Sequence, residues 1–237
     1  MVRECTGTGR MRIERSIEVK LFPVILLFLI TVLPGYTEEY VYAMNTDDGE
    51  YRITTQIIRD DENGTRQVEK HDPVTGVVHR FVLDEWGGTV SWQIVFHDRE
   101  VLFSRDGMTI ISTEKPGGSN DAIPITIDGS PWFAAIPEGL QLFVIDGSKK
   151  MEFWTIDPGT HKPYRMVAKR GKNVDLIIQG TTERAIPVTV SPSGVPAIFF
   201  SMKFWYRESD GMFLRYKGKA GGPGSADVIT ELMHEEQ

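Results

Sequence analysis

The chain has 237 residues, of which 26 are Lys or Arg and 33 are Asp or Glu, and its formal net charge at pH 7 is -7. The excess of carboxylates argues against general affinity for nucleic acid, and the length is enough for one domain with a hydrophobic core. The charge is uneven, because residues 44–148 hold 8 basic and 18 acidic side chains and residues 149–237 hold 13 and 10. The more basic half could meet an anionic group, although a solvated sheet face explains the same count.

The first segment has the pattern of a secretory signal peptide. Cationic residues precede the apolar run Leu21–Leu33, which Pro23 interrupts. A bilayer span needs about 20 apolar residues, so this shorter run is typical of a signal-peptide core. We predict a signal peptide over residues 1–43, cleavage after Ala43 and export, with the periplasm as the predicted location. An uncleaved N-terminal membrane anchor is the alternative, and only this segment is expected to meet a membrane.

The single cysteine of the chain, Cys5, lies inside this predicted signal peptide. The mature protein, residues 44–237, is therefore expected to have no disulfide, no thiolate metal site and no cysteine nucleophile. No cysteine follows the apolar run, so lipid attachment at a lipoprotein-type cysteine is excluded as well.

From residue 44 onward, segments of period-two alternation are separated by turns rich in Asp and Gly. In the first half the strand candidates are residues 51–60, a polar segment that ends at Lys70, Val77–Leu83, Thr89–His97, Glu100–Ser104 and Met108–Thr113, followed by AIPITIDGSPWF (122–133), a strand that ends in a turn. Residues 140–145 form the one helix candidate, and they could also form a strand.

The second half has the pattern of a meander of consecutive antiparallel strands. Its strand candidates are MEFWTI, PYRMVAKR, VDLIIQG, AIPVTV, SMKFWYR, MFLRYKG and DVITELM. Segments of this length with no helix between them predict an all-β fold. A twisted sheet of this size must curl, close or split. We therefore predict one all-β domain over residues 44–237, an antiparallel meander curled into a half-barrel or β-roll with little helix.

The hairpin around Ser209-Asp210-Gly211 is the most regular part of this pattern. A three-residue loop with Gly211 in the left-handed conformation fits the turn. It predicts four facing pairs, which are Phe204 with Tyr216, Tyr206 with Leu214, Trp205 with Arg215, and Arg207 with Phe213. One face of the hairpin would then be apolar or aromatic, and the other would alternate cations with rings. Either face can be the concave one.

The apolar face predicts a set of candidate ligand-binding residues on consecutive strands. They are Trp154, Met166, Leu176, Ile178, Phe204, Tyr206, Leu214 and Tyr216. These side chains either form a core that the first-half strands cover or line an open apolar groove on a curved sheet. The groove interpretation predicts an exported, non-enzymatic protein that holds a lipid, a lipoprotein or another apolar ligand.

The other face of the hairpin gives the alternative function, a structural or interaction module of the cell envelope with a filled core. Its contact residues for an envelope protein would be Trp205, Arg207, Phe213 and Arg215, which combine cations with aromatic rings.

No pattern of residues indicates catalysis or metal binding. The five histidines are scattered, and no two have the i, i+4 spacing that presents two imidazoles to one metal. No serine lies in a Gly-x-Ser-x-Gly turn. We therefore predict no catalytic residue, no metal and no cofactor; a hydrolase is a third alternative that no constellation supports.

Two hairpins of the second half share one form, an aromatic strand, an acidic turn and a basic strand. They are MEFWTIDPGTHKPYRMVAKR and KFWYRESDGMFLRYKG. This form resembles exported bacterial envelope proteins of uncharacterised families related to the periplasmic lipoprotein-carrier superfamily. The resemblance covers residues 149–232 and implies a half-barrel whose concave face holds acyl chains or another apolar ligand. Such carriers close the barrel with helices, whereas this chain offers almost none, which favours an open or self-filled β-roll.

Overall fold

The structure, a computed structural model, describes residues 37–46, 49, 51–60, 64–115, 122–194, 200–219 and 225–236. The apolar run of the predicted signal peptide and Cys5 lie outside the described residues. The contacts of the chain group residues 35–237 into one compact unit.

The described residues of this unit form fifteen strands and two short helices. The strands of the first half are β1 (Thr37–Thr46), β2 (Tyr51–Asp60), β3 (Arg66–His71), β4 (Val78–Leu83), β5 (Thr89–Val95), β6 (Glu100–Asp106), β7 (Thr109–Lys115) and β8 (Ile123–Thr126). The helices are α1 (Ile136–Gly139) and α2 (Gln141–Ile145). The strands of the second half are β9 (Lys150–Asp157), β10 (Lys162–Arg170), β11 (Val174–Ile178), β12 (Thr181–Pro192), β13 (Met202–Arg207), β14 (Phe213–Lys219) and β15 (Asp227–Glu236).

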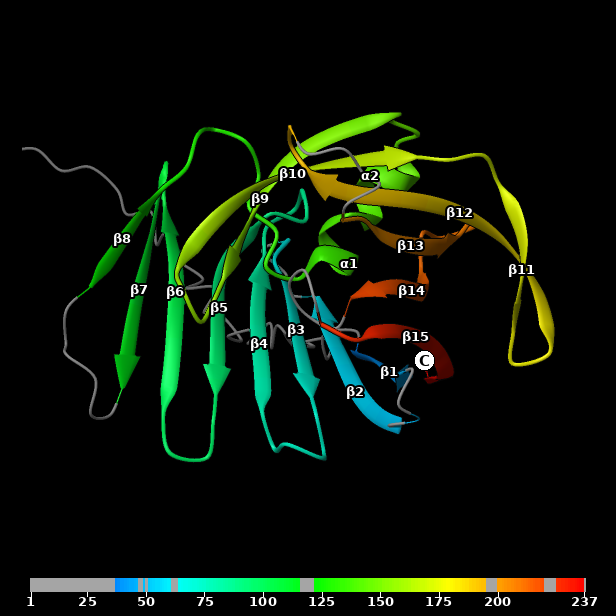
Figure 1. Cartoon of the computed structure of the whole chain (residues 1–237), viewed down its shortest axis with the longest axis horizontal. Helices are drawn as coiled ribbons and strands as arrows, with labels where there is room; N and C mark the ends of the chain where they lie inside the picture. Colours follow the sequence, from blue (N-terminus) through cyan, green and yellow to red (C-terminus); the bar gives the residue numbers. More distant parts are fainter. Residues whose placement is uncertain are drawn as a thin grey trace, which may run out of the picture. The chain divides into compact units, whose positions relative to one another are not determined.

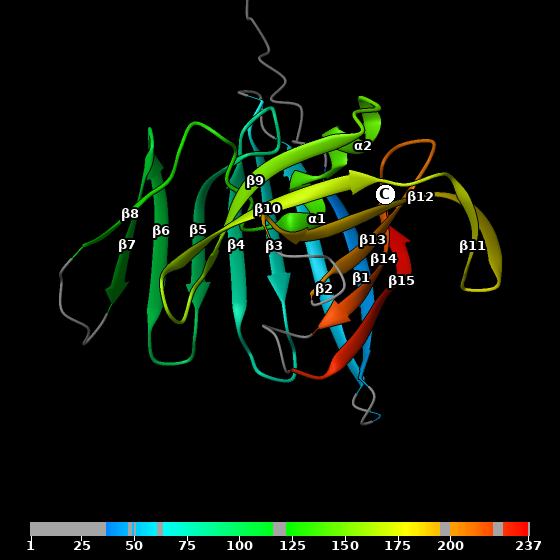
Figure 2. The same ribbon diagram turned by 45° about the horizontal axis from the view of Figure 1, so that its top comes forward.

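All strands belong to one antiparallel sheet. Their order is β8-β7-β6-β5-β4-β3-β2-β1-β15-β14-β13-β12-β10-β9, and β11 pairs with β12. The first and last strands therefore lie side by side in the middle of the sheet, and β8 and β9 form its two ends. The sheet curls, so that β9 and β10 cross in front of the strands β3 to β6 (Figures 1 and 2). The predicted all-β half-barrel is confirmed.

The segment between β8 and β9 connects the two ends of the curled sheet. The Trp154 backbone of β9 forms hydrogen bonds of 2.8 Å with the Pro131 carbonyl and the Phe133 amide, and the Thr89 amide of β5 donates to the Trp132 carbonyl at 2.7 Å. Residues 131–133 thus bridge β9 and β5, while β8 and β9 are not paired with each other in the described sheet. The same segment continues into α1 and α2, which lie inside the curl (Figure 1).

The strands β2 to β15 are predicted from the sequence, whereas β1 is not. This strand contains Tyr40 and Tyr42, which are 1% and 3% exposed, and it pairs on both sides, with β2 and β15. The predicted cleavage point after Ala43 lies in the middle of β1. A domain that began at residue 44 would lack the two buried tyrosines, so the strand favours a domain boundary ahead of Thr37.

The hairpin of β13 and β14 has a longer loop than we predicted and a bulge that compensates for it. The Arg207 amide donates to the Met212 carbonyl at 2.7 Å, so four residues form the loop, and Gly211 has the expected positive φ of 71°. Tyr206 then faces Phe213 rather than Leu214. One step further along β13 the register shifts, and the predicted pairs Trp205 with Arg215 and Phe204 with Tyr216 are present. The prediction was wrong only next to the turn, because a bulge adds a residue without reversing the rest of the strand.

The bulge decides which face each side chain of the hairpin occupies. Phe204 lies 5.1 Å from Tyr216 and 6.2 Å from Phe213 between ring centroids, and Tyr206 lies 6.0 Å from Phe213. These four rings therefore share the concave face. Leu214 packs in a different hydrophobic cluster, together with the β11 residues Leu176 and Ile178.

Candidate functional site

The helices α1 and α2 cross the concave face of the sheet and are tied to both sides of it. The Lys70 ammonium of β3 contacts the two carboxylate oxygens of Glu138 at 2.8 and 2.9 Å. The Arg66 guanidinium donates to the Gln141 side chain at 2.7 Å, also from β3. On the other side, the Tyr206 hydroxyl of β13 donates to the Pro137 carbonyl at 3.0 Å. These bonds hold α1 and α2 in place between β3 and β13. We refer to residues 131–145, which include both helices, as the crossing segment.

Two glycines allow α1 to lie this close to its neighbours. A Cβ atom on Gly139 would lie 2.6 Å from the Phe133 ring, and a Cβ atom on Gly87 would lie 3.1 Å from the Gly139 carbonyl oxygen. Gly87 also has a positive φ of 79°, which other residues rarely adopt. The β4–β5 turn and the first helix therefore pack backbone against backbone.

Under the helices the concave face is filled with side chains. Phe133, Leu140, Phe143 and Val144 of the crossing segment pack on strands β9, β10, β12 and β13. Their partners on those strands include Phe153, Met166, Ala168, Ile186, Val188, Val190, Phe204 and Tyr206. We refer to this packed cluster as the filled end of the concave face.

Beyond α1 the same face borders a hollow of about 440 Å³, which we call the apolar groove. Its walls include Met44, Ile136, Met202, Phe204, Phe213 and Tyr216. Pockets that hold small molecules have volumes of about 300–1,000 Å³ and mostly apolar walls. The apolar groove has both properties, and two lysines, Lys70 and Lys219, lie along it.

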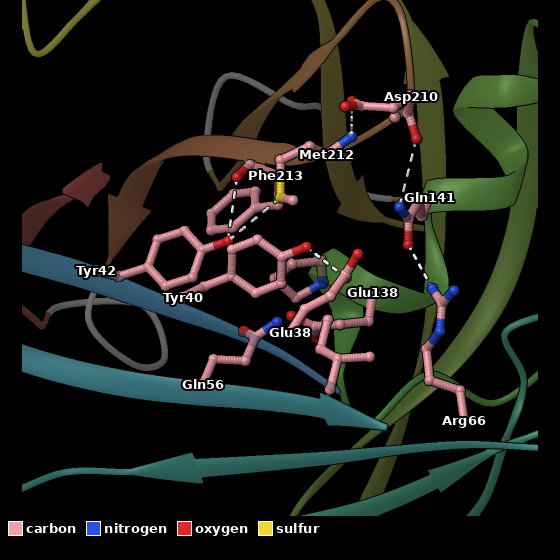
Figure 3. Close-up of a pocket in the computed structure, with 13 residues that line it drawn as sticks. Glu38, Tyr40, Tyr42, Gln56, Arg66, Glu138, Gln141, Asp210, Met212 and Phe213 are labelled. Atoms are coloured by element: carbon pink, nitrogen blue, oxygen red, sulfur yellow. Dashed lines mark hydrogen bonds between the residues drawn. The ribbon is translucent and has the colours of Figure 1, made fainter. Parts of the chain in front are cut away.

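A second hollow, the polar cavity, has a volume of about 190 Å³ and is shown in Figure 3. Tyr42, Gln56, Pro137 and Phe213 line both hollows. The polar cavity adds ionisable side chains from four parts of the chain, which are Glu38, Arg66, Glu138 and Asp210. The Tyr40 hydroxyl donates to the Glu38 carboxylate, and the Tyr42 hydroxyl donates to the Phe213 carbonyl at 3.2 Å.

Burial controls the ionisation of the hydroxyl groups and of one histidine near these hollows. It raises the pKa of Tyr206 well above its ordinary value, and the negative charge of Glu138 adds to this shift. Burial also raises the pKa of Tyr216 to about 12. On β4, beside Lys70, burial and then the lysine charge lower the pKa of His79 to about 4. All three groups are therefore neutral at pH 7.

Three of the eight predicted ligand-binding residues, Met166, Phe204 and Tyr206, belong to the filled end. Phe204 also lines the apolar groove, together with Tyr216, so these two predicted residues border the hollow.

The other four predicted ligand-binding residues lie elsewhere. Leu176, Ile178 and Leu214 belong to the other cluster. Trp154 packs against that cluster too, and its indole donates to Asp128 at 2.8 Å, which lowers the pKa of that carboxyl to about 2. The structure therefore does not bring the eight residues together on one surface.

The predicted partner-binding residues are divided between the two faces of the sheet. Phe213 points into the concave side, where it lines both hollows. Arg207 pairs with Glu183 at 3.5 Å and with Asp210 at 3.0 Å. Arg215 donates to Glu231 at 2.6 Å and to the Ile177 carbonyl at 2.8 Å. Trp205 is half-buried, with the Lys203 ammonium 4.8 Å from its ring centroid. Both arginines are thus already neutralised by carboxylates of this chain.

Sequence reasoning missed several residues that line the hollows, above all Glu38, Tyr40 and Tyr42. They were assigned to the signal peptide, although Tyr40, Tyr42 and Met44 alternate with the period of a strand. The ion pair of Lys70 and Glu138 joins residues far apart in the chain, and no spacing in the sequence indicates it.

No family model matches the chain, and no curated protein matches its sequence. Solved structures do show similar folds. One is the β-barrel-like protein of the domain of unknown function DUF1849 from Brucella abortus, with a TM-score of 0.60 and 10% identity over 84% of this chain and 97% of that one. This likeness supports the fold.

Less similar structures include the hypothetical lipoprotein YmcC from Escherichia coli, with a TM-score of 0.41 and 10% identity over 86% of this chain and 89% of that one. Another is a LolA superfamily protein from Nitrosomonas europaea, with a TM-score of 0.28 and 5% identity over 85% of each chain. Proteins of the lipoprotein-carrier superfamily, which the sequence resembles, are thus among the structures that resemble this chain weakly.

None of the described helices is both long and apolar enough to span a bilayer. No group of three or more His, Cys, Asp or Glu side chains in this part of the chain is arranged to hold a metal ion.

Proposed function

We propose that this protein is an exported, non-enzymatic binding protein that holds a lipid or another apolar ligand in the apolar groove. The observation that carries the proposal is the hollow of about 440 Å³ on the concave face, with walls of Met, Phe, Tyr and Ile side chains. Methionine and aromatic side chains adapt to ligands of different shape. The apolar run ahead of β1 supports export.

The structure gives less support to an envelope interaction module that uses the cation–aromatic face. Arg207 and Arg215 are engaged with Glu183, Asp210 and Glu231, so a partner would have to displace these carboxylates. Ion pairs at a protein surface contribute little to stability, but a partner that displaces one of them leaves a carboxylate unpaired, which costs free energy.

The test is native mass spectrometry of the exported protein before and after organic extraction. We expect a bound mass of lipid size that is lost on extraction. A Thr230→Trp variant should lose the bound mass, because Thr230 lines the apolar groove and an indole would fill part of it. Thr182→Trp, at an exposed position of β12, is the matched control and should keep the ligand. A clean ligand-free mass, together with no binding of an environment-sensitive fluorophore, would contradict the proposal.

A further inference from the structure

The polar cavity has the composition of a site for a positively charged head group. Aromatic rings of Tyr40, Tyr42 and Phe213 line it, and the rings of Tyr42 and Phe213 lie 5.3 Å apart between centroids. The faces of aromatic rings carry negative electrostatic potential and attract ammonium groups, including quaternary ones. Figure 3 shows these rings on one side of the cavity and the Arg66 guanidinium on the other, where it donates to Gln141.

One carboxylate of this cavity is available to a ligand charge. Glu138 is paired with Lys70, and Asp210 is paired with Arg207 at 3.0 Å. Glu38 accepts a hydrogen bond from the Tyr40 hydroxyl, and no Lys or Arg among the described residues forms an ion pair with it. A carboxylate beside three aromatic rings favours a cation over an anion.

The cations near the apolar groove do not offer a comparable site for an anionic head. The Lys70 ammonium contacts Glu138, and the Lys219 ammonium lies 2.9 Å from Asp227. An anionic head in the polar cavity would meet one cation, Arg66, and three carboxylates, those of Glu38, Glu138 and Asp210. The balance of charge therefore disfavours carboxylates and sulfates as head groups.

We propose that the ligand is an amphiphile with an ammonium head, which lies in the polar cavity against Glu38 and the rings of Tyr40, Tyr42 and Phe213, while its chain lies in the apolar groove. The inference rests on the proposed function and names the ligand class for the same site. The two hollows share the lining residues Tyr42, Gln56, Pro137 and Phe213 and therefore adjoin, and the proposal places one molecule across both.

The experiment compares two probes with the same chain and opposite head charge, dodecyltrimethylammonium and dodecanoate. Each is titrated into the purified full-length protein by isothermal calorimetry, below its critical micelle concentration. We expect the ammonium probe to bind at least about tenfold more tightly. Lysophosphatidylcholine is titrated in the same way and distinguishes a zwitterionic lipid from a simple cation as the source of the ammonium. Binding of lysophosphatidylcholine or of dodecyltrimethylammonium that is tighter than that of dodecanoate supports the proposal.

Two variants test the head-group site itself. Glu38→Gln keeps a hydrogen-bond acceptor for Tyr40 but removes the charge, and it should weaken the ammonium probe about tenfold without weakening dodecanoate. Phe213→Leu keeps apolar volume but removes a ring, and it should also weaken the ammonium probe selectively. Asp98→Asn, in the exposed turn between β5 and β6, is the matched control for lost negative charge and should change neither affinity. Thermal melting of each variant confirms that it is folded.

The outcomes separate this inference from the proposed function. Equal affinity for the two probes, tighter binding of dodecanoate, or an unchanged ammonium affinity in Glu38→Gln would overturn the ammonium site while leaving an apolar binding protein. Failure of all three amphiphiles to bind would overturn the proposed function as well.

Discussion

The concave face differs between its two ends although both ends are built from similar side chains. At the filled end, Phe143 and Leu140 pack on Phe153 and Val188, and each of these residues is at most 1% exposed. Over β1, β14 and β15 the same face carries Met44, Tyr216 and Thr230 and borders the apolar groove. The difference arises from the crossing segment, because α1 and α2 cover one end and stop short of the other. Apolar strand residues thus become core or binding surface according to what covers them.

The largest effect we expect comes from shortening β1, which lies under both hollows. A protein that begins at Met44 lacks Tyr40 and Tyr42, and each buried aromatic residue removed costs about 3–5 kcal/mol. Their sum is comparable with the total stability of a domain, about 5–15 kcal/mol. We expect this protein to be unfolded by circular dichroism and by the dispersion of its amide NMR signals, whereas one that begins at Gly35 folds. A well-folded protein from Met44 would contradict the assigned role of β1.

The two ends of the concave face should respond differently to truncation of an apolar side chain. Phe153→Ala at the filled end should lower the free energy of unfolding by about 3–5 kcal/mol, because the crossing segment cannot collapse into the space. Met202→Ala beside the apolar groove should cost about 1 kcal/mol or less, since solvent or ligand already reaches it. Urea denaturation checks both. Equal losses would show that the two ends do not differ in packing.

The Lys70–Glu138 pair joins a residue of the apolar groove to a residue of the polar cavity, and either partner or both can be replaced. Lys70→Met leaves the Glu138 carboxylate, whose side chain is 3% exposed, without its cation and should cost about 3–5 kcal/mol. Adding Glu138→Met removes the unpaired buried carboxylate, so the double variant should recover most of the lost free energy of unfolding. Arg80→Met, which breaks the exposed pair with Glu69, is the control and should cost under about 1 kcal/mol. A double variant no more stable than Lys70→Met would contradict this account.

The fold class could be predicted because strand alternation is a local signal. The segments of β2 to β15 show this alternation. The pairs Phe204–Tyr216 and Trp205–Arg215 follow from the number of residues that separate them from the β13–β14 turn. The bulge at Leu214 could not be predicted in the same way. Leu214 packs in the same cluster as the β11 residues Leu176 and Ile178, which lie about 40 positions earlier in the chain, and no local pattern indicates that packing.

The candidate site was predicted less well, for a physical reason. A curved sheet has two faces, and a sequence with apolar side chains on both does not say which one is covered. Leu176 and Leu214 are as apolar as Phe204, yet only Phe204 of these three reaches the apolar groove. The cover is the α1–α2 segment, whose place depends on two glycines and on the bonds from Lys70, Arg66 and Tyr206.

A smaller effect, dependent on pH, should arise at His79, which pairs across the strands with Lys70, a residue that lines the apolar groove. Its pKa is about 4 in the folded protein against 6.5 for an ordinary histidine, mainly because it is buried. The unfolded chain therefore binds a proton first as the pH falls, and stability should drop by about 1–3 kcal/mol between pH 6.5 and 4. His79→Gln can still accept the hydrogen bond that Trp92 donates at 3.2 Å, and it should flatten this part of the pH profile. His97→Gln, at an exposed turn, should leave the profile unchanged, and urea midpoints at several pH values measure all three proteins. An equally steep fall in His79→Gln would assign the acid sensitivity to other groups.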